Sequence, residues 1–221
     1  MNGNSSKQVL LSVLGIAVLV VAVVGVSFAF FTYSKAGTKN NTLTTGSIFF
    51  NFTEGQAITL TNQFPIDDTK GSTLTAAEGD NAVLTFSVVG YDGSGTGIDY
   101  TITANQGNSI AEKTRFKDSE IKLLLTTTAS GVTNNFSTAK VVGTDGSLAT
   151  GVTLATGKIT ATSSGAQQTD TYTLRMWITE DVVSIDDNDT PADGDSVYTS
   201  TEFGKLYYSL RLKVDANTSG A

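Results

Sequence analysis

Apolar and polar residues alternate along most of the chain beyond residue 47. A period of two puts successive side chains on opposite faces of an extended strand, so each alternating segment predicts a β-strand with one buried and one solvated face. Seven segments show this pattern, at residues 47–52, 58–61, 84–88, 98–102, 121–125, 172–178 and 206–214. No long segment has the apolar period of an amphipathic helix. Short helices are predicted only at 109–116 and at 199–203, where a Thr-x-x-Glu capping pattern opens the segment.

The segments between the strands are rich in Gly, Asp, Ser and Asn, which favour turns. Residues 91–97 predict a hairpin loop, and 186–195 a long acidic loop. The Gly, Thr and Ser-rich stretch 143–165 predicts an insertion outside the core. Many short strands separated by turns favour an all-β fold, closed as an antiparallel β-sandwich of jelly-roll or immunoglobulin-like type.

An N-terminal hydrophobic helix is predicted before this β region. The run from Val9 through Leu19 to Phe31 contains no charged residue, and its 23 residues would extend roughly 35 Å as a helix, enough to cross a membrane. The length favours a retained transmembrane signal-anchor. The small residues Ser27 and Ala29 also permit cleavage after Ala29, as in a secretory signal peptide. Both interpretations stay open.

The pattern divides the chain into four parts. A short polar N-terminus (1–8) precedes the hydrophobic segment (9–31), which is followed by a polar tether (32–46) and the β-sandwich ectodomain (47–221). This order predicts a membrane-anchored protein with an extracytoplasmic domain, or a secreted one if the segment is removed. Membrane lipid is the partner that a retained segment predicts.

Composition removes most familiar enzyme chemistry. The chain has no Cys and no His, so disulfides, thiolate sites, the usual zinc ligands and the commonest general base are missing. Its formal net charge is −7, and no basic patch for nucleic acid is visible. We therefore expect a non-enzymatic protein that does not bind nucleic acid.

The acidic loop at 186–195 is the candidate metal site. Asp187, Asp189, Asp193 and Asp195 could supply carboxylate oxygens to a calcium ion if the loop folds back on itself. The Gly and Glu that the EF-hand spacing requires are missing, and a solvated loop explains the same residues without a ligand. No other cofactor is predicted.

Two aromatic groups have predicted faces. Phe50 and Phe52 should face the core and Phe49 the opposite side of the same strand. Trp177 should point away from its neighbours Met176 and Ile178, which makes it a candidate interface residue or a stacking partner for a cation on the same outer face.

The motifs of the N-terminal half also occur together in one known family. The run at 25–31, the stretch at 40–46 before an apolar strand, the strand at 58–62 and the turn at 65–67 follow one another in the same order. Over about residues 20–105 the chain resembles the TasA and camelysin family of exported, fibre-forming matrix proteins, with Ile66 in place of the family's turn Gly.

This resemblance implies a structural subunit of an extracellular filament or surface layer, whose N-terminal segment completes the sheet of the next subunit. The opening of the chain also resembles membrane-anchored β-domain proteins of large DNA viruses. That alternative implies a minor, capsid-associated protein of the virion membrane. A cell-surface module that binds a carbohydrate or protein ligand is a third interpretation.

Strand donation makes a specific prediction for the residues after the cleavage position. If Ala29 is the last residue removed, Phe30, Phe31 and Tyr33 form the apolar head of an extended arm that a neighbouring subunit could accept by strand addition. Neighbouring copies are then the expected partners. A retained anchor instead predicts the same aromatics at the membrane surface.

Overall fold

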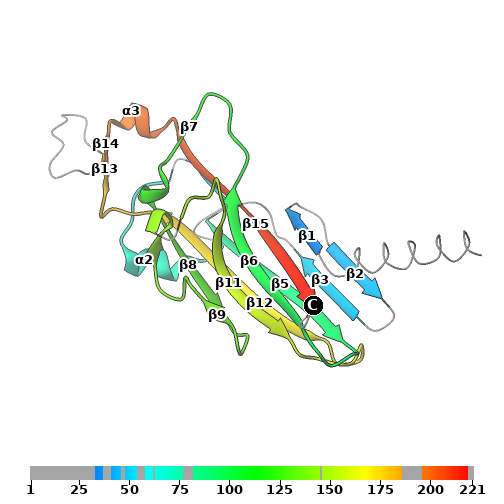
Figure 1. Cartoon of the computed structure of the whole chain (residues 1–221). Helices are drawn as coiled ribbons and strands as arrows, with labels where there is room; N and C mark the ends of the chain where they lie inside the picture. The colour runs from blue at the N-terminus through cyan, green and yellow to red at the C-terminus, as the bar shows by residue number, and fades with distance from the viewer. Residues whose placement is uncertain are drawn as a thin grey trace, which may run out of the picture.

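The computed structural model describes residues 33–36, 41–45, 48–53, 58–61, 63–76, 82–144, 146–185 and 196–218. In these residues the chain is mostly β-strand, and almost all strand pairs are antiparallel (Figure 1). The all-β prediction is confirmed. The jelly-roll or immunoglobulin-like assignment and the N-terminal helix stay predictions.

The larger sheet has seven strands, in the order β1-β15-β6-β11-β9, with β4 and β7 also paired to β15. Its strands are β1 (Tyr33–Ala36), β4 (Ile58–Thr61), β6 (Ile98–Gln106), β7 (Thr114–Arg115), β9 (Thr133–Asn134), β11 (Val152–Ile159) and β15 (Leu206–Thr218). β7 runs parallel to β15, whereas the other pairs are antiparallel.

The second sheet has six antiparallel strands, in the order β10-β8-β12-β5-β3-β2. Its strands are β2 (Asn41–Thr45), β3 (Ile48–Thr53), β5 (Val83–Asp92), β8 (Ile121–Thr127), β10 (Lys140–Val141) and β12 (Gln168–Ile178). Outside the two sheets lie the parallel pair β13 (Val183–Ile185) and β14 (Ser196–Tyr198), the helices α2 (Asp68–Thr73) and α3 (Ser200–Phe203), and the 3-10 turns η1 (Asp118–Glu120) and η2 (Val142–Thr144).

The two sheets share one hydrophobic core, built from the alternating apolar residues that the sequence shows. In β5 every second side chain is buried, and the same alternation continues through β6 and most of β12. Phe50 and Phe52 are buried while Phe49 is only half-buried, which confirms the predicted faces of that strand. All seven predicted strands are present.

Two predicted local elements have different outcomes. The helix at 199–203 is confirmed, and Thr199 and Glu202 form the expected capping box. The helix predicted at 109–116 is wrong, because Thr114–Arg115 is the strand β7. The backbone N–H groups of Thr114 and Phe116 donate to the carbonyls of Lys205 and Tyr207, so pairing with β15 replaces helical hydrogen bonds there.

Two predictions about connections are also wrong. The loop after β5 does not close a hairpin, because β5 and β6 belong to different sheets, and it connects those sheets instead. The stretch 143–165 is not an insertion outside the core, since it contains β11, whose Val152, Leu154 and Ile159 are buried. Its Thr residues alternate with these apolar residues, which is the pattern of a strand with one wet face.

The predicted polar tether at 32–46 contains two strands. β1 joins the larger sheet and β2 joins the smaller one, so the folded domain begins before residue 47. The prediction that this segment is only a polar tether is therefore corrected. The hydrophobic run from Val9 through Leu19 to Phe31 lies outside the described residues. Within the described part of the chain, no helix has the length and hydropathy needed to span a membrane.

Candidate functional site

The candidate assembly site is the edge of the seven-stranded sheet where the N-terminal strand pairs with β15. On one side, β15 pairs with β6 from residue 210 to residue 218. On the other side it pairs with two short strands, β4 opposite Tyr207–Leu210 and β1 opposite residues 213–216. Tyr33 lies opposite Ala216, and Ala36 lies opposite Lys213. The outermost strand over this half of β15 is therefore only four residues long.

The half of β15 that β1 covers carries part of the core. Val214 and Ala216 are buried, whereas Lys213 and Asp215 lie on the outer face and form an ion pair at 2.9 Å. Among the described strands, β1 pairs with β15 alone. Its four residue pairs thus hold β1 at the sheet edge, and the same backbone groups of β15 would accept any strand of equal length and direction.

Only one of the predicted arm residues falls inside the structure. Tyr33 begins β1 and pairs within its own chain rather than extending as a free arm. Phe30, Phe31 and the predicted cleavage residue Ala29 lie outside the described residues. The structure therefore gives the position that the N-terminal strand takes in a single chain, next to Val214 and Ala216.

The prediction that Trp177 is an exposed contact residue is wrong. This side chain is 2 % exposed, because α2 covers the outer face of β12 at this point. A Cβ atom on Gly71 of α2 would lie 2.3 Å from Cε2 of the indole. Arg175 does not stack on Trp177 as an exposed pair but donates from Nε to the carbonyl of Leu74 at 2.9 Å. Trp177 is therefore a packing residue under α2 and not an exposed contact.

An apolar cavity of about 280 Å³ lies beside this packing. Leu60, Phe64, Met176 and Trp177 contribute to its walls, and Lys70 is the charged residue among those that line it. Phe64 is 71 % exposed, and its ring stacks on that of Phe203 with 6.1 Å between centroids.

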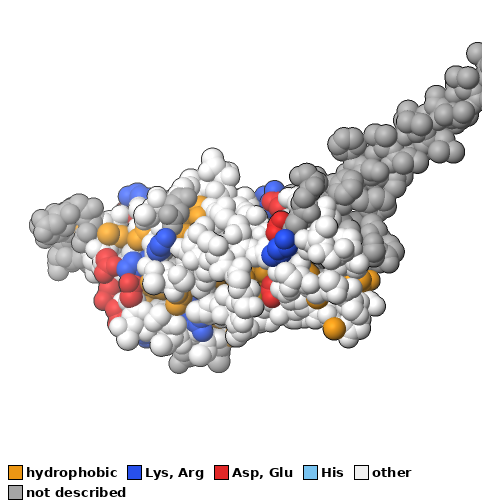
Figure 2. All heavy atoms as spheres, turned by 60° about the horizontal axis from the view of Figure 1, so that its bottom comes forward, with side chains coloured by type: hydrophobic (Ala, Val, Ile, Leu, Met, Phe, Trp, Pro, Cys, Tyr) orange, Lys and Arg blue, Asp and Glu red, His pale blue; other side chains and the backbone are white. Residues whose placement is uncertain are grey.

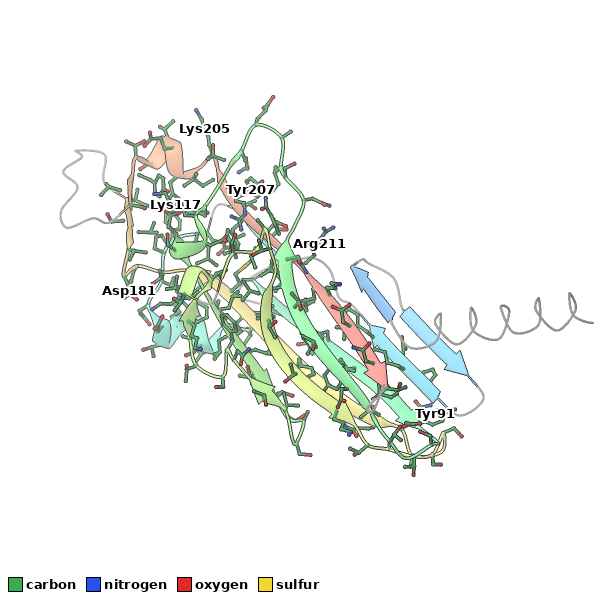
Figure 3. The ribbon with its side chains drawn as sticks, viewed as in Figure 1. Tyr91, Lys117, Asp181, Lys205, Tyr207 and Arg211 are labelled. Atoms are coloured by element: carbon green, nitrogen blue, oxygen red, sulfur yellow. The ribbon has the colours of Figure 1, made fainter. Side chains whose placement is uncertain are left out.

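Three charged residues attach α2 to the six-stranded sheet. Lys122, which is 8 % exposed, donates to Asp68 of α2 at 2.8 Å and also contacts Asp181. Burial alone would lower the pKa of Lys122, but the hydrogen bonds to the two carboxylates outweigh it and raise that pKa. Asp181 lies at the α2 end of the molecule, far from Tyr91 at the other end (Figure 3).

Asp92 organises the loop that connects the two sheets. Its buried carboxylate accepts hydrogen bonds from the backbone N–H groups of Ser94 and Gly97 and from the hydroxyls of Ser94 and Thr96. Burial alone would raise the pKa of Asp92, but these donors lower it to about 2. Gly97 adopts a φ of 88°, which suits glycine and lets its N–H approach the carboxylate at 2.6 Å.

A second buried carboxylate joins the sheets through two tyrosines. The Tyr100 hydroxyl on β6 lies 2.5 Å from Asp170 Oδ2 and 2.6 Å from the Tyr172 hydroxyl on β12. Burial and these neighbours raise the pKa of Tyr100, and burial raises the pKa of Tyr172 to about 12. Gly157 makes room for this network, since a Cβ there would lie 2.3 Å from the Tyr100 hydroxyl oxygen.

A third polar cluster lies between η1 and β15. Asp118 Oδ1 accepts from Arg115 at 2.6 Å and from the Tyr208 hydroxyl at 2.8 Å, and Oδ2 accepts from Ser147 and from the Leu148 backbone N–H. The Arg115 guanidinium also lies over the Tyr208 ring, 4.2 Å from its centroid. Burial opposes ionisation of Asp118, but the hydrogen bonds from Arg115 and Tyr208 outweigh it and lower its pKa.

These clusters share one arrangement. In each cluster one carboxylate accepts several hydrogen bonds. Those at Asp170 and Asp118 come partly from other elements and fix these elements relative to one another, whereas those at Asp92 come from its own loop and fix the conformation of that loop. Sequence reasoning did not single out Asp92, Asp118 or Asp170. For Asp92 and Asp170 a signal was present, since each is a charged residue at an inward-facing position of an alternating strand.

The predicted calcium ligands Asp187, Asp189, Asp193 and Asp195 lie outside the described residues. In the part of the chain that is described, no three His, Cys, Asp or Glu side chains are grouped so that they could hold a metal ion.

Comparison with protein-family models, with curated proteins and with solved structures finds no match to this chain. The resemblance to the TasA and camelysin family therefore stays a prediction from the motifs between residues 20 and 105.

Proposed function

We propose that this chain is a non-enzymatic structural subunit of an extracytoplasmic filament or surface layer, and that subunits join by exchanging the N-terminal strand β1. The observation that carries the proposal is the antiparallel pairing of β1 with residues 213–216 of β15 at the edge of the seven-stranded sheet. On this proposal the domain is a sandwich of jelly-roll or immunoglobulin-like type, exported with the help of the hydrophobic segment.

Strand exchange requires no new contact surface. The backbone groups of β15 form the same hydrogen bonds whether β1 comes from the same chain or from a neighbour, so the two states differ mainly in linker geometry and effective concentration. Because donor and acceptor are different surfaces of each subunit, repeated exchange builds an open chain of subunits unless the geometry closes it into a ring.

The residues before β1 favour exchange after processing. Cleavage after Ala29 would leave Phe30 and Phe31 directly ahead of Tyr33. Burial of each phenylalanine against a neighbour stabilises a junction by about 1.5–3 kcal/mol.

Paired cysteines test the exchange directly, because the natural chain contains no Cys. Ser34 lies opposite Asp215 in the register of β1 and β15, so Ser34→Cys with Asp215→Cys places two thiols on facing residues. After assembly and oxidation, we expect disulfide-linked multimers on a non-reducing gel. Mixing chains that carry only Ser34→Cys with chains that carry only Asp215→Cys should give linked dimers.

A matched pair inside the six-stranded sheet provides the control. Ser87 lies opposite Thr171, so Ser87→Cys with Thr171→Cys should link within one chain and give a monomer band. If the Ser34 and Asp215 pair also gives only internally linked monomers at high protein concentration, strand exchange is rejected. The virion-membrane alternative would then be the better account.

A further inference from the structure

The outer face of the six-stranded sheet is rich in hydroxyl groups. On β5 the outward residues include Thr85 and Ser87, and on β12 they include Thr171 and Thr173. The strand register brings these four into facing pairs, Thr85 with Thr173 and Ser87 with Thr171. The two oxygen atoms of each pair are 3.3 Å apart.

The array continues onto the neighbouring strands. Thr126 of β8 lies opposite Thr173, so three threonines form one row across three strands. Rows follow one another along a strand at about 6.6–6.8 Å, and strands lie about 4.8 Å apart, which gives a regular grid on the twisted sheet. We call this surface the hydroxyl face, made of Phe49, Asn51, Thr85, Ser87, Val89, Tyr91, Thr126, Thr169, Thr171 and Thr173.

None of these ten residues is Asp, Glu, Lys or Arg, although the chain has a net charge of −7. The next outward position on β12 after Thr173 is Arg175, whose guanidinium donates to the Leu74 carbonyl and to Thr126 Oγ1, so one cation borders the hydroxyl face beside Thr126. The outer face of the other sheet is different, because it carries Asp99, Lys158, Arg211, Lys213 and Asp215. On the side of the molecule seen in Figure 2, charged side chains form small groups and most of the surface is neither charged nor hydrophobic.

An aromatic pair ends the hydroxyl face. The rings of Phe49 and Tyr91 stack at 5.9 Å between centroids with 17° between their planes. Both residues are half-buried, and Tyr91 lies where β5 ends (Figure 3). At the other end of the face, α2 covers Trp177, so the grid is bounded there.

We propose that the hydroxyl face binds a neutral, β-linked polysaccharide. A pair of hydroxyls that share one hydrogen bond still offers one donor and several acceptor positions, which suits the hydroxyls of a sugar chain. A regular grid matches a polymer with a regular repeat, and the aromatic pair offers an apolar surface to a sugar ring. A neutral polymer also avoids the repulsion that a net charge of −7 imposes on an anionic one.

The composition of the face argues against a protein partner. Ser, Thr and Val are under-represented among the residues that dominate binding energy between proteins. Five of the ten residues of the hydroxyl face are Thr, and Ser87 and Val89 add to them. This inference does not depend on strand exchange, because β1 lies in the other sheet.

Sedimentation with insoluble polymers tests the proposal on the full-length chain. The protein is kept in a polyoxyethylene detergent, which carries no sugar, and mixed with microcrystalline cellulose or chitin. We expect saturable depletion of the protein by at least one polymer, with little effect of added salt because the ten residues of the face and the polymer are both uncharged.

The decisive variant is Thr85→Val/Thr171→Val/Thr173→Val, which removes three hydroxyls and keeps β-branched side chains that suit a strand. Loss of up to three hydrogen bonds should weaken binding at least about tenfold. The matched control, Thr101→Val/Thr103→Val/Thr156→Val on the outer face of the other sheet, should bind like the natural chain. Melting curves recorded by the fluorescence of Trp177, the single tryptophan, check that both variants fold.

Three results would overturn the proposal. The first is no depletion by either polymer, and the second is equal binding by the two triple variants. The third is that the natural chain self-associates in sedimentation velocity, the Thr85/Thr171/Thr173 variant does not, and neither protein binds a polysaccharide. That result would assign the face to a second copy of the chain. The cysteine-pair experiment is unaffected by each of these outcomes, so the two proposals fail separately.

Discussion

Asp92, in the loop that connects the two sheets, should make the free energy of unfolding fall in acid. Asp92 is fully buried and accepts hydrogen bonds from four groups of the loop, from Ser94, Thr96 and Gly97. The pKa of its carboxyl is lowered from 3.8 to about 2. Each unit of difference between the folded and unfolded pKa corresponds to about 1.4 kcal/mol of stability, so the ionised carboxylate contributes about 2 kcal/mol.

The direction of the pH effect follows from the lowered pKa. The unfolded chain binds a proton on Asp92 more readily than the folded chain does, so folding is favoured by this group above about pH 4. The contribution is lost as the pH falls from about 4 through about 2. Asp92→Asn removes the titrating group and also points an amide N–H₂ at groups that are themselves donors. The variant should therefore be about 2 kcal/mol less stable at neutral pH, yet lose less stability in acid.

Urea unfolding followed by the emission of Trp177 measures both effects, because this is the single tryptophan and it is buried. The free energy of unfolding is compared at neutral pH and at about pH 2.5 for the natural chain and for Asp92→Asn. Asp99→Asn, which changes an exposed aspartate on the next strand, controls for the change in net charge. Parallel pH curves for the natural chain and Asp92→Asn would refute the assignment of this acid sensitivity to Asp92.

Three further changes probe packing at the two ends of the core. Gly157→Ala should lower the free energy of unfolding by about 1–3 kcal/mol because its Cβ would displace the Tyr100 hydroxyl, and an unchanged urea midpoint would contradict this. Gly71→Ala should push α2 away from Trp177 and shift its emission to the red, as read from a fluorescence spectrum under native conditions. Lys122→Met should lower the free energy of unfolding in urea by less than about 1 kcal/mol, because its two aspartate partners are half-exposed or more. A larger decrease would contradict this expectation.

The strands themselves could be predicted because a period of two is a local signal. Phe50 and Phe52 alternate with polar or less buried neighbours, and each such choice of face depends only on the pleat of one strand. The capping box of Thr199 and Glu202 is local in the same sense and was also predicted correctly. Local signals do not say which strands share a sheet, which explains the error for the loop between β5 and β6.

Long-range packing explains the remaining errors. Trp177 lies on the outward phase of its strand, as its position between two inward residues indicates, but α2 comes from a segment about a hundred residues earlier and covers it. The strand β7 at Thr114 forms because β15 offers it backbone partners, and nothing in residues 109–116 encodes that partner. At the candidate assembly edge, Tyr33 was predicted to belong to a free arm and a tether, and the strand β1 was missed because its partner, residues 213–216, lies at the far end of the chain.

Because β1 lies so close to the hydrophobic run, removal or retention of that run decides which subunits β1 can reach. Only Thr32 separates Phe31, the last residue of the hydrophobic run, from Tyr33, the first residue of β1. If the hydrophobic run stays in a membrane, the paired edge of β1 and β15 must lie against the lipid surface, and β1 can reach only subunits held in the same membrane. Release by cleavage after Ala29 removes that restriction and frees Phe30 and Phe31 for a neighbour. If subunits join by the proposed exchange of β1, we expect an extended filament from a native chain that begins at Phe30, and at most a layer in the plane of the membrane from a native chain whose intact mass includes the whole hydrophobic run.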